Sequence, residues 1–388
     1  MRRREFLLRA AGLAAGLIVA RGARSQPPGA PSASDPRAPA SDAPATRPRP
    51  AGHVVTLAVA GDTTLGYNLE THVDEMLEGG VLPEYVWPVY SRGIRDVLDA
   101  ADLGVVNLEC PFTARGEKLV KNFNFRAHPE LVKILEAASI DAVTLANNHL
   151  MDYGAQGLAD TIATLDAAHI AWFGAGEREK VARRPLVLKR NGVRIGFLGY
   201  YFQAPPDMLE PEAVYALKHR AGVAGCYEDL ECMKRMAQED LRKLVHKVDA
   251  AIPFFHWGKE GSYDVRDYQI ELAHMCVDFG AKAVLGAHPH RLQGVEVYRG
   301  APILYSLGNF IFGGNKDPDD KLSMIARIEI ARKGDVACEL VPIQITTWPD
   351  SPFQPFVLEG DARMAALARI AELSRPFSST LPQLRSVG

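Results

Sequence analysis

Apolar runs rich in β-branched residues alternate with stretches of helical periodicity along most of the chain. In the first half, the runs that predict strands span residues 53–60, 103–108 and 141–146, and the stretches that predict helices span residues 91–101 and 128–138. Each predicted strand is followed by a polar cluster: Gly61-Asp62, Glu109 and Asn147-Asn148-His149, in that order. An alternation of strands and helices is typical of layered α/β architecture.

The second half repeats this alternation and then changes to strands joined without helices. Predicted helices at 228–247 and 265–279 lead to predicted strands at 250–255 and 283–285, which are followed by His256-Trp257-Gly258 and by the segment from Gly286 to His290. Asn191-Gly192 suits a type I′ turn, so the runs on either side of it predict a hairpin. The later runs, at 294–298, 303–305, 323–330 and 336–345, are mostly β. Helix-linked strands favour parallel pairing and hairpin-linked strands favour antiparallel pairing. The sequence therefore predicts an α/β fold of two mixed sheets packed face to face with helices outside, an αββα sandwich.

The first 52 residues predict an export signal and a tether. Arg2, Arg3 and Arg4 precede an apolar run, residues 10–20, that is shorter than the roughly 20 residues needed to span a bilayer. This order resembles a twin-arginine signal peptide, with a small-residue cleavage site at 23–25, and an uncleaved membrane anchor is the alternative. We expect residues 1–25 to be the signal, 26–52 a disordered Pro- and Ala-rich linker, 53–345 the folded domain and 346–388 a C-terminal extension packed on it. The expected location is the periplasm or cell envelope, with membrane association if the signal is retained.

Composition excludes some functions and leaves others open. The chain has 388 residues, 47% of them hydrophobic, and a formal net charge of -3. The absence of a basic excess argues against a nucleic-acid partner, although a local groove that binds a polyanion remains compatible with it. The five Cys have no metal-like spacing. Pairing of Cys226 with Cys232 is an alternative, but two separate thiols are favoured.

Candidate metal ligands follow the predicted strands. Of eleven His, those at 149, 256, 288 and 290 each follow an apolar β run, whereas six others are interpreted as surface or core residues. Asp62 and Glu109 are the matching carboxylates; each alone is equally well a helix cap or turn residue. Ligands in open α/β sheets bind beyond the carboxyl ends of the strands, and imidazole and carboxylate groups are usual ligands for zinc, manganese or iron. One or two divalent metal ions, of manganese, zinc or iron, are therefore the expected cofactor.

Ordered motifs across roughly residues 54–315 resemble one protein family. The blocks are Gly61-Asp62-Thr63-Thr64-Leu65-Gly66, Asn107-Leu108-Glu109, Ala146-Asn147-Asn148-His149 with Asp152-Tyr153-Gly154, His256-Trp257-Gly258-Lys259-Glu260, Gly286-Ala287-His288-Pro289-His290 with Gln293 and Glu296, and Tyr305-Ser306-Leu307-Gly308-Asn309-Phe310. In this order they are similar to the poly-gamma-glutamate capsule biosynthesis protein CapA family. The resemblance implies membership of the metallophosphatase, or calcineurin-like phosphoesterase, superfamily and its two-sheet sandwich fold.

The resemblance also implies roles for individual residues. Asp62 and His290 would hold one metal, Glu109 would bridge two metals, and Asn148, His256 and His288 would hold the other. His149 would be the general acid, with Asp152 as its catalytic companion. A carboxylate that bridges two cations and an imidazole that titrates near neutral pH suit metal-assisted hydrolysis.

One position departs from that pattern, and the roles of several neighbouring residues stay open. The superfamily usually has His two residues after its first Asp, whereas this chain has Thr64, so the first metal lacks one expected ligand. Among nearby cations, Arg126 and Arg291 are equally well substrate-binding or surface residues, and surface charge is favoured for Lys121 and Lys259. Asn309 either orients a ligand or caps a loop, and Trp257 is either core or a binding platform.

Two functions compete at this stage. One is a metal-dependent hydrolase that acts on a phosphoester or on an anionic polymer such as poly-gamma-glutamate. The other is a non-catalytic accessory factor that binds the polymer and assists its export or anchoring. In either case, membrane-bound components of a polymer synthase are candidate partners.

The export signal is directly testable. Replacing Arg3 and Arg4 with Lys should leave the protein in the cytoplasmic fraction, because the twin-arginine pair is what the export machinery would read. Cell fractionation followed by immunoblotting measures the distribution. Unchanged export of the double variant would rule this signal out.

Overall fold

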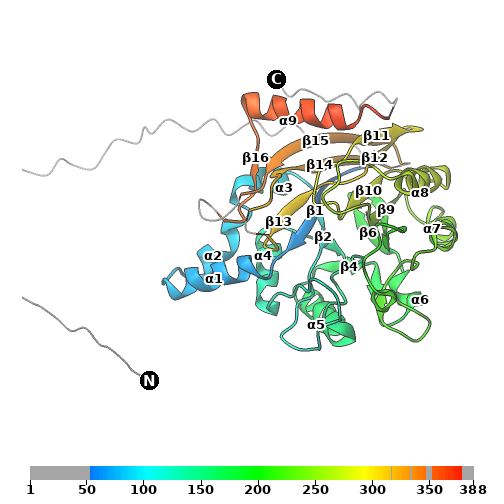
Figure 1. Cartoon of the computed structure of the whole chain (residues 1–388). Helices are drawn as coiled ribbons and strands as arrows, with labels where there is room; N and C mark the ends of the chain where they lie inside the picture. The colour runs from blue at the N-terminus through cyan, green and yellow to red at the C-terminus, as the bar shows by residue number, and fades with distance from the viewer. Residues whose placement is uncertain (1–52, 316, 333, 347–351, 378–388) are drawn as a thin grey trace, which may run out of the picture. The chain divides into compact units, whose positions relative to one another are not determined.

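Two β-sheets form the centre of the folded domain. The computed structural model describes residues 53–315, 317–332, 334–346 and 352–377, so the predicted signal and linker lie outside the described residues. Figure 1 shows the arrangement of the elements. No helix of the described ranges is long and apolar enough to cross a membrane.

The larger sheet joins the N-terminal strands to those near the C-terminus. Its order is β16-β15-β14-β1-β2-β3-β4, with β13 also paired to β1. The pairs β1–β13, β1–β2, β2–β3 and β3–β4 are parallel. The pairs β1–β14, β14–β15 and β15–β16 are antiparallel. The bounds are β1 Val54–Thr64, β2 Leu103–Leu108, β3 Ala142–Thr144, β4 Ala171–Phe173, β13 Asn309–Phe312, β14 Leu322–Ala331, β15 Val336–Gln344 and β16 Phe356–Val357.

The smaller sheet contains the remaining long strands. Its order is β11-β12-β10-β9-β7-β6, with bounds β6 Leu186–Arg190, β7 Val193–Phe202, β9 Ala250–Trp257, β10 Val284–Ala287, β11 Val295–Tyr298 and β12 Ala301–Leu304. Asn191 and Gly192 have φ of 48° and 80°, the positive pair that a type I′ turn needs, and β6 and β7 are antiparallel. The predicted hairpin is therefore confirmed. A short pair, β5 Ala175–Gly176 and β8 Gly222–Val223, lies outside both sheets.

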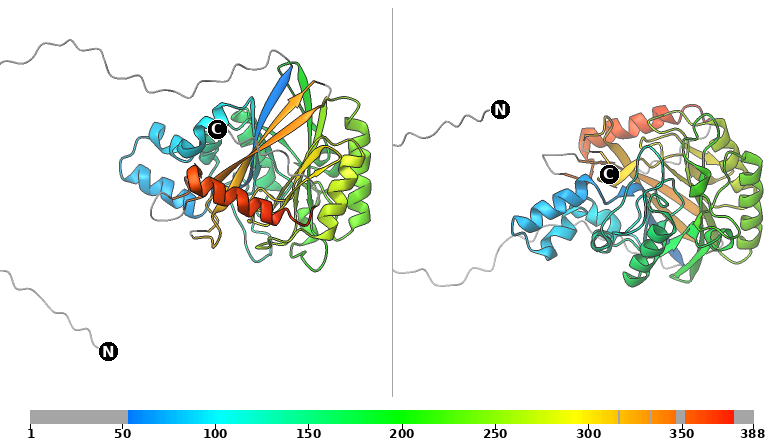
Figure 2. Two further views of the ribbon diagram at one scale, coloured as in Figure 1. Left: turned by 90° about the horizontal axis from the view of Figure 1, so that it is seen from above. Right: turned by 60° about the horizontal axis from the view of Figure 1, so that its bottom comes forward.

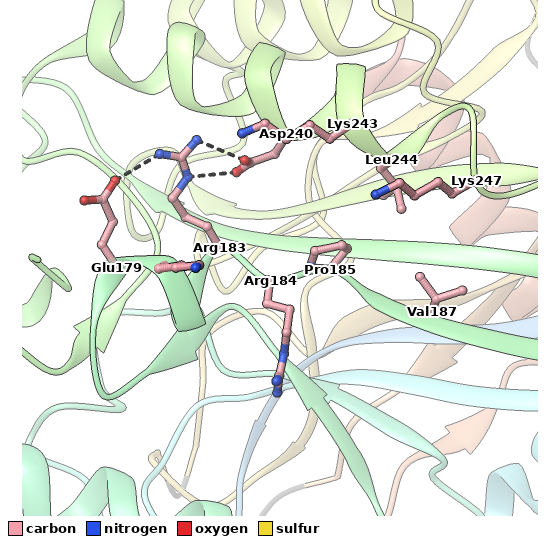
Figure 3. A pocket seen from close by; sticks show the side chains of 10 residues that line it. Glu179, Arg183, Arg184, Pro185, Val187, Asp240, Lys243, Leu244 and Lys247 are labelled. Atoms are coloured by element: carbon pink, nitrogen blue, oxygen red, sulfur yellow. Dashed lines mark hydrogen bonds and ion pairs between the residues drawn. The ribbon is translucent and has the colours of Figure 1, made fainter.

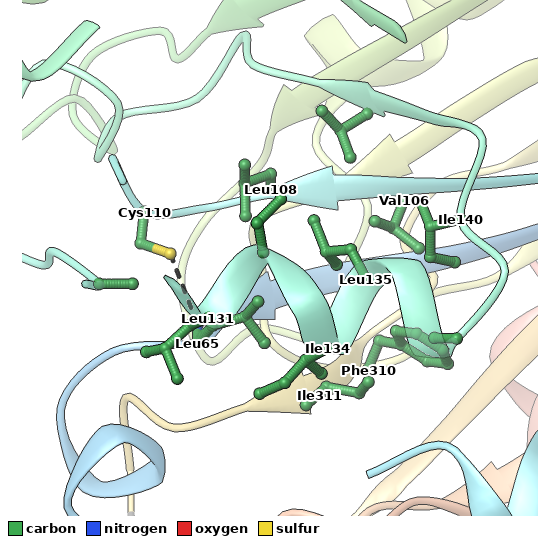
Figure 4. Close-up of a cluster of buried hydrophobic side chains, with 14 of the residues drawn as sticks. Leu65, Val106, Leu108, Cys110, Leu131, Ile134, Leu135, Ile140, Phe310 and Ile311 are labelled. Atoms are coloured by element: carbon green, nitrogen blue, oxygen red, sulfur yellow. Dashed lines mark hydrogen bonds between the residues drawn. The ribbon is translucent and has the colours of Figure 1, made fainter. Parts of the chain in front are cut away.

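Three apolar layers hold the sheets and helices together. Between the sheets, β1 and β14 pack against β7, β9 and β10 through residues such as Leu57, Ile328 and Ile252. On the other face of the larger sheet lie α1 Asn68–Glu78, α2 Pro83–Val89, α3 Arg95–Asp99, α4 Val132–Ala137 and α5 Gly154–Ala167. Figure 4 shows Ile134 and Leu135 of α4 among the apolar side chains of this layer.

The outer face of the smaller sheet is covered by α7 Leu230–Leu244 and α8 Asp267–Asp278. In both views of Figure 2, α7 and α8 lie on the opposite side of the strands from α1 and α2. The helix α9 Gly360–Leu373 crosses β15 and β11, one from each sheet, and buries Ile370 between them (Figure 1). The predicted mixed two-sheet sandwich flanked by helices is confirmed.

Two strands that carry candidate ligands extend further than the sequence pattern indicated. β1 continues through Gly61 and Asp62 to Thr64 because Asp62 pairs with Asn107 of β2 and with Asn309 of β13. β9 likewise continues through His256, which pairs with Ala287 of β10. Asp62 and His256 therefore project from strand ends rather than from the loops that follow them. Both residues are polar, but hydrogen bonds from their backbone to the neighbouring strands keep them within a strand.

The preference for two separate thiols at Cys226 and Cys232 is wrong, because a disulfide joins them. Glu228, with φ of 55°, turns the chain, and the Asp229 side chain accepts a hydrogen bond from the Cys232 N–H at 2.8 Å and caps α7. This turn brings the two Cα atoms to 6.0 Å. Spacing alone could not distinguish this pairing from two free thiols.

Candidate metal centre

The carboxyl ends of strands from both sheets meet at one site. Asp62 lies near the end of β1, Glu109 directly follows β2, and His256 lies near the end of β9. His288 and His290 follow β10 and have φ of 100° and 54°. Such values are uncommon for residues with a side chain. All five side chains are buried or nearly so.

Four potential metal-ligand atoms, one of them Nε2 of His256, lie close together. Its Nε2 lies 2.8 Å from Asn148 Oδ1, 2.9 Å from His288 Nδ1 and 3.3 Å from Glu109 Oε1. One ring nitrogen carries at most one proton, so it cannot form hydrogen bonds to all three partners. Ligand atoms that each lie about 2 Å from a shared ion are separated by about 3–3.5 Å. This cluster therefore has the dimensions of a cation site.

The carboxylate of Glu109 is buried, and its nearest partners are the imidazoles of His256 and His290. Both of its oxygens are buried without a hydrogen bond from any described residue. Burial, and then the charge of Asp62, hold the pKa of Glu109 well above its usual value, with His290 acting in the opposite direction. A buried carboxylate is normally paired, hydrogen-bonded or bound to a metal. Glu109 is therefore the strongest single indication of a bound cation.

Asp62, Glu109 and His290 form a second, smaller group. Nδ1 of His290 lies 3.2 Å from Asp62 Oδ2, and Nε2 lies 3.8 Å from Glu109 Oε1. Burial lowers the pKa of His290, but Glu109 and Asp62 outweigh it and raise the value to about 10. The Thr64 hydroxyl donates to the backbone carbonyl of Glu109 at 3.2 Å. The second group thus offers fewer donors than the first.

Neighbouring amides fix the orientation of these groups. Asn107 donates to Asp62 Oδ1 at 2.7 Å, and the same nitrogen lies 3.1 Å from His256 Nδ1. Gln203 donates to the Gly258 carbonyl, and its nitrogen lies 2.8 Å from His288 Nε2. Sequence reasoning quoted Asn107 only as part of a motif and did not identify Gln203. Such outer contacts orient metal ligands and tune their affinity.

His149 lies beside the donor cluster with a defined orientation. Its Nδ1 is 2.7 Å from Asp152 Oδ2, and its ring packs on Phe125 with the ring centroids 4.2 Å apart. Burial, and then the charges of Lys121 and His290, hold the pKa of His149 well below its usual value. Burial also raises the pKa of Asp152 to about 7, although Lys121 acts against this. Nε2 of His149 is therefore the ring nitrogen left for a ligand.

Lys121 was interpreted from the sequence as surface charge, and that interpretation is wrong. Its side chain is only 3% exposed, and its ammonium lies 2.8 Å from Asp152 Oδ1 and 2.9 Å from Glu210 Oε2. It also donates to the Asn148 carbonyl at 2.8 Å. Glu210 in turn accepts from the Asn148 amide nitrogen at 3.2 Å, which turns the amide oxygen toward His256. Lys121 and Glu210 lie in long loops with no periodic pattern, so no sequence signal pointed to them.

The predicted substrate-binding residues lie in different settings. Asn309 Oδ1 is 2.8 Å from His290 Nδ1, and Arg291 donates to the His290 carbonyl at 3.1 Å. Arg126 is exposed, with its guanidinium 4.9 Å from the centre of the Tyr153 ring. Trp257 is fully buried and donates to the Tyr305 carbonyl, so it belongs to the core. The substrate-binding roles of the first three residues stay predictions.

The sequence matches a known protein family. Residues 56–314 match the family model described as "Bacterial capsule synthesis protein PGA_cap". The chain is 30% identical over 304 residues to "Capsule biosynthesis protein CapA" of Bacillus anthracis, an alignment that covers 77% of this chain and 69% of the relative. It is also 30% identical over 297 residues to "PGA biosynthesis protein CapA" of Bacillus subtilis, covering 75% and 72%.

Two further matches cover a shorter stretch or have a lower identity. A "probable polyglutamine synthesis accessory protein" of Mycobacterium tuberculosis is 30% identical over 259 residues, covering 64% of this chain and 67% of the relative. A solved structure of a hypothetical protein from Thermus thermophilus aligns with a TM-score of 0.41 and 15% identity, covering 74% of this chain and 99% of that chain. The family model spans more than half of the chain and all the strand ends described above, so the chain belongs to the bacterial capsule synthesis protein PGA_cap family.

Proposed function

We propose that this protein is an exported, metal-dependent hydrolase that acts on an anionic envelope polymer, with poly-gamma-glutamate as the substrate class. The observation that carries the proposal is the buried carboxylate of Glu109, without a hydrogen-bond partner, among converging donors and beside the His149–Asp152 pair. The names of the relatives, which refer to capsule, PGA and polyglutamine synthesis, support the choice of polymer. The arginine-rich start of the chain supports export.

The donor set fits a divalent cation with mixed nitrogen and oxygen ligands. Glu109, His256 and His288, completed by Asn148, would hold one ion, and Asp62, Glu109 and His290 would hold a second. When bound, such ions supply Lewis acidity and acidify a coordinated water to a nucleophile near neutral pH. The richer donor set around His256 favours occupation of the first position over the second.

His149 is suited to move a proton beside this site. Asp152 accepts from Nδ1 and thereby fixes the tautomer and the ring orientation, while Phe125 restricts rotation of the ring. Nε2 of the neutral ring then carries no proton, so it can take one from the attacking water and pass it to the leaving group of the substrate. Asp152 lies behind His149 and acts on the substrate through it.

Lys121 is a positioning residue for both parts of the site. It forms ion pairs with two buried carboxylates, Asp152 behind His149 and Glu210 behind Asn148. An unpaired buried carboxylate is costly, so without Lys121 one or both would protonate or move. The orientation of a metal ligand and of the proton-transferring imidazole thus depends on one cation.

Metal binding should stabilise the protein through Glu109. Adding manganese to a chelator-treated sample, at about 100 times its dissociation constant, should raise the melting temperature by about 5 °C. Glu109→Gln should abolish the rise because it removes the central charge. Glu296→Gln, a change at another buried Glu that pairs with His274, is the matched control and should retain the rise. An equal rise in Glu109→Gln, or none in the wild type, would contradict the metal assignment.

His149→Ala separates an enzyme from a polymer-binding accessory factor. The variant should bind metal normally but hydrolyse a generic phosphodiester or a γ-linked glutamate polymer about 10²–10⁴-fold more slowly, because the proton-transferring group is gone. Turnover is measured with manganese, zinc and iron, and His274→Ala is the control. Undiminished capsule-related activity of His149→Ala in cells, with no turnover by the wild type, would favour the accessory factor.

Lys121→Met should weaken both metal affinity and turnover, each by about 10–100-fold, because the outer contacts of Asn148 and His149 are lost. Lys121→Arg should restore part of the loss, since it keeps the charge. Lys118→Met, at an exposed position in the same loop, is the control and should behave as wild type. Metal titration and steady-state kinetics are run on samples shown to be folded by circular dichroism. Normal metal affinity and turnover in Lys121→Met would refute the positioning role.

A further inference from the structure

A second concave site lies on the smaller sheet, among residues that take no part in the metal centre. It is a pocket of about 590 Å³ between the short helix α6 Glu179–Ala182, the start of β6 and the C-terminal part of α7. Figure 3 shows its lining side chains. Five of the lining residues are basic and two are acidic: Lys180, Arg183, Arg184, Lys243 and Lys247 against Glu179 and Asp240.

Arg183 engages both acidic groups of the lining. Its guanidinium forms two bonds to Asp240, at 3.0 Å and 2.9 Å, and one to Glu179 at 3.0 Å. It also contacts Glu239 at 3.0 Å. Figure 3 shows the guanidinium held between Glu179 and Asp240. Both acidic groups of the lining therefore form ion pairs with the same cation.

The other four cations of the lining form no close ion pair, although the charge of Lys243 contributes to lowering the pKa of Glu239. Lys180, Arg184, Lys243 and Lys247 form no ion pair with any residue that the structure describes. Arg184 extends away from the Arg183 group in Figure 3, and its guanidinium lies 6.0 Å from the centre of the Trp172 ring. The carbonyl end of α7 favours cations at Lys243 and beyond. The pocket thus presents an excess of positive charge that is not neutralised internally.

Apolar groups separate these cations. Leu244 is buried, Val187 is 45% exposed, and Pro185 lies beside them in the lining. A ligand that matches this surface carries several negative charges spaced along a chain with methylene groups. Poly-gamma-glutamate has this chemistry, with one carboxylate and two methylenes in each repeat.

We propose that this pocket binds a segment of the carboxylate polymer and is a holding site separate from the metal centre. The inference rests on the proposed function for the identity of the polymer. Binding here requires no metal, because every attractive group belongs to the side chains of the pocket. The site would hold a long polymer on the protein while another part of the chain reaches the metal centre.

The test is calorimetric titration of the full chain with a decamer of γ-linked glutamate in excess chelator. The double variant Lys243→Glu with Lys247→Glu should bind the decamer about tenfold more weakly than wild type, because two attractive charges become repulsive. Arg92→Glu with Arg375→Glu, at exposed positions outside the pocket, gives the same change in net charge and should bind within twofold of wild type. Affinity should also fall as salt rises.

The outcomes separate this proposal from the hydrolase proposal. Equal affinity of the two double variants for the decamer, or no binding of the decamer by the wild type, would overturn the proposed binding site. Phosphodiester turnover, measured separately with metal, would be unaffected by either result. If the wild-type protein shows no turnover but binds the decamer through Lys243 and Lys247, only the hydrolase proposal would be overturned. Tripolyphosphate is titrated in parallel. If the affinity for tripolyphosphate depends on Lys243 and Lys247 and the affinity for the decamer does not, the pocket binds phosphate anions and the carboxylate assignment is wrong.

Discussion

Two carboxylates and three imidazoles are buried together where the carboxyl ends of β1, β2, β9 and β10 meet. Burial of this much polar and charged surface is unfavourable unless the groups satisfy one another or bind an ion. Asp62 is satisfied by Asn107 and by the His288 N–H, and His290 by Asn309 and Asp62. Glu109 has two imidazoles within ion-pair distance but accepts no hydrogen bond from the described residues. A bound cation would compensate for this imbalance.

The fold supplies the geometry that makes the imbalance possible. Parallel pairing of β1 with β2 and of β9 with β10 brings four strand ends to one edge, and packing of the two sheets brings the edges together. Close backbone approach is part of this arrangement, since a Cβ on Gly61 would lie 1.9 Å from the Gly308 carbonyl oxygen. Asp62 and His256 are thus carried by strands, the other ligand groups follow strand ends, and Lys121 and Glu210 reach them from loops. A site supported by paired strands keeps its geometry better than one built on loops alone.

Sequence reasoning reached the strands and their polar ends because apolar runs and turn residues are local signals. It placed Glu109 after β2 and the hairpin at Asn191-Gly192 for that reason. It ended β1 and β9 too early, because only pairing with neighbouring strands keeps Asp62 and His256 within a strand. Lys121 and the pairing of Cys226 with Cys232 were missed for a related reason. A buried cation in an irregular loop and a disulfide across a turn are defined by tertiary contacts that leave no periodic trace.

The most direct test of the account is to locate the cation. Crystals of the protein soaked in manganese should show an anomalous difference peak about 2–2.3 Å from a carboxylate oxygen of Glu109 and from Nε2 of His256. The peak should be absent from Glu109→Gln crystals treated in the same way. If the wild-type crystals show no peak among Asp62, Glu109, His256, His288 and His290, these side chains do not form a metal centre.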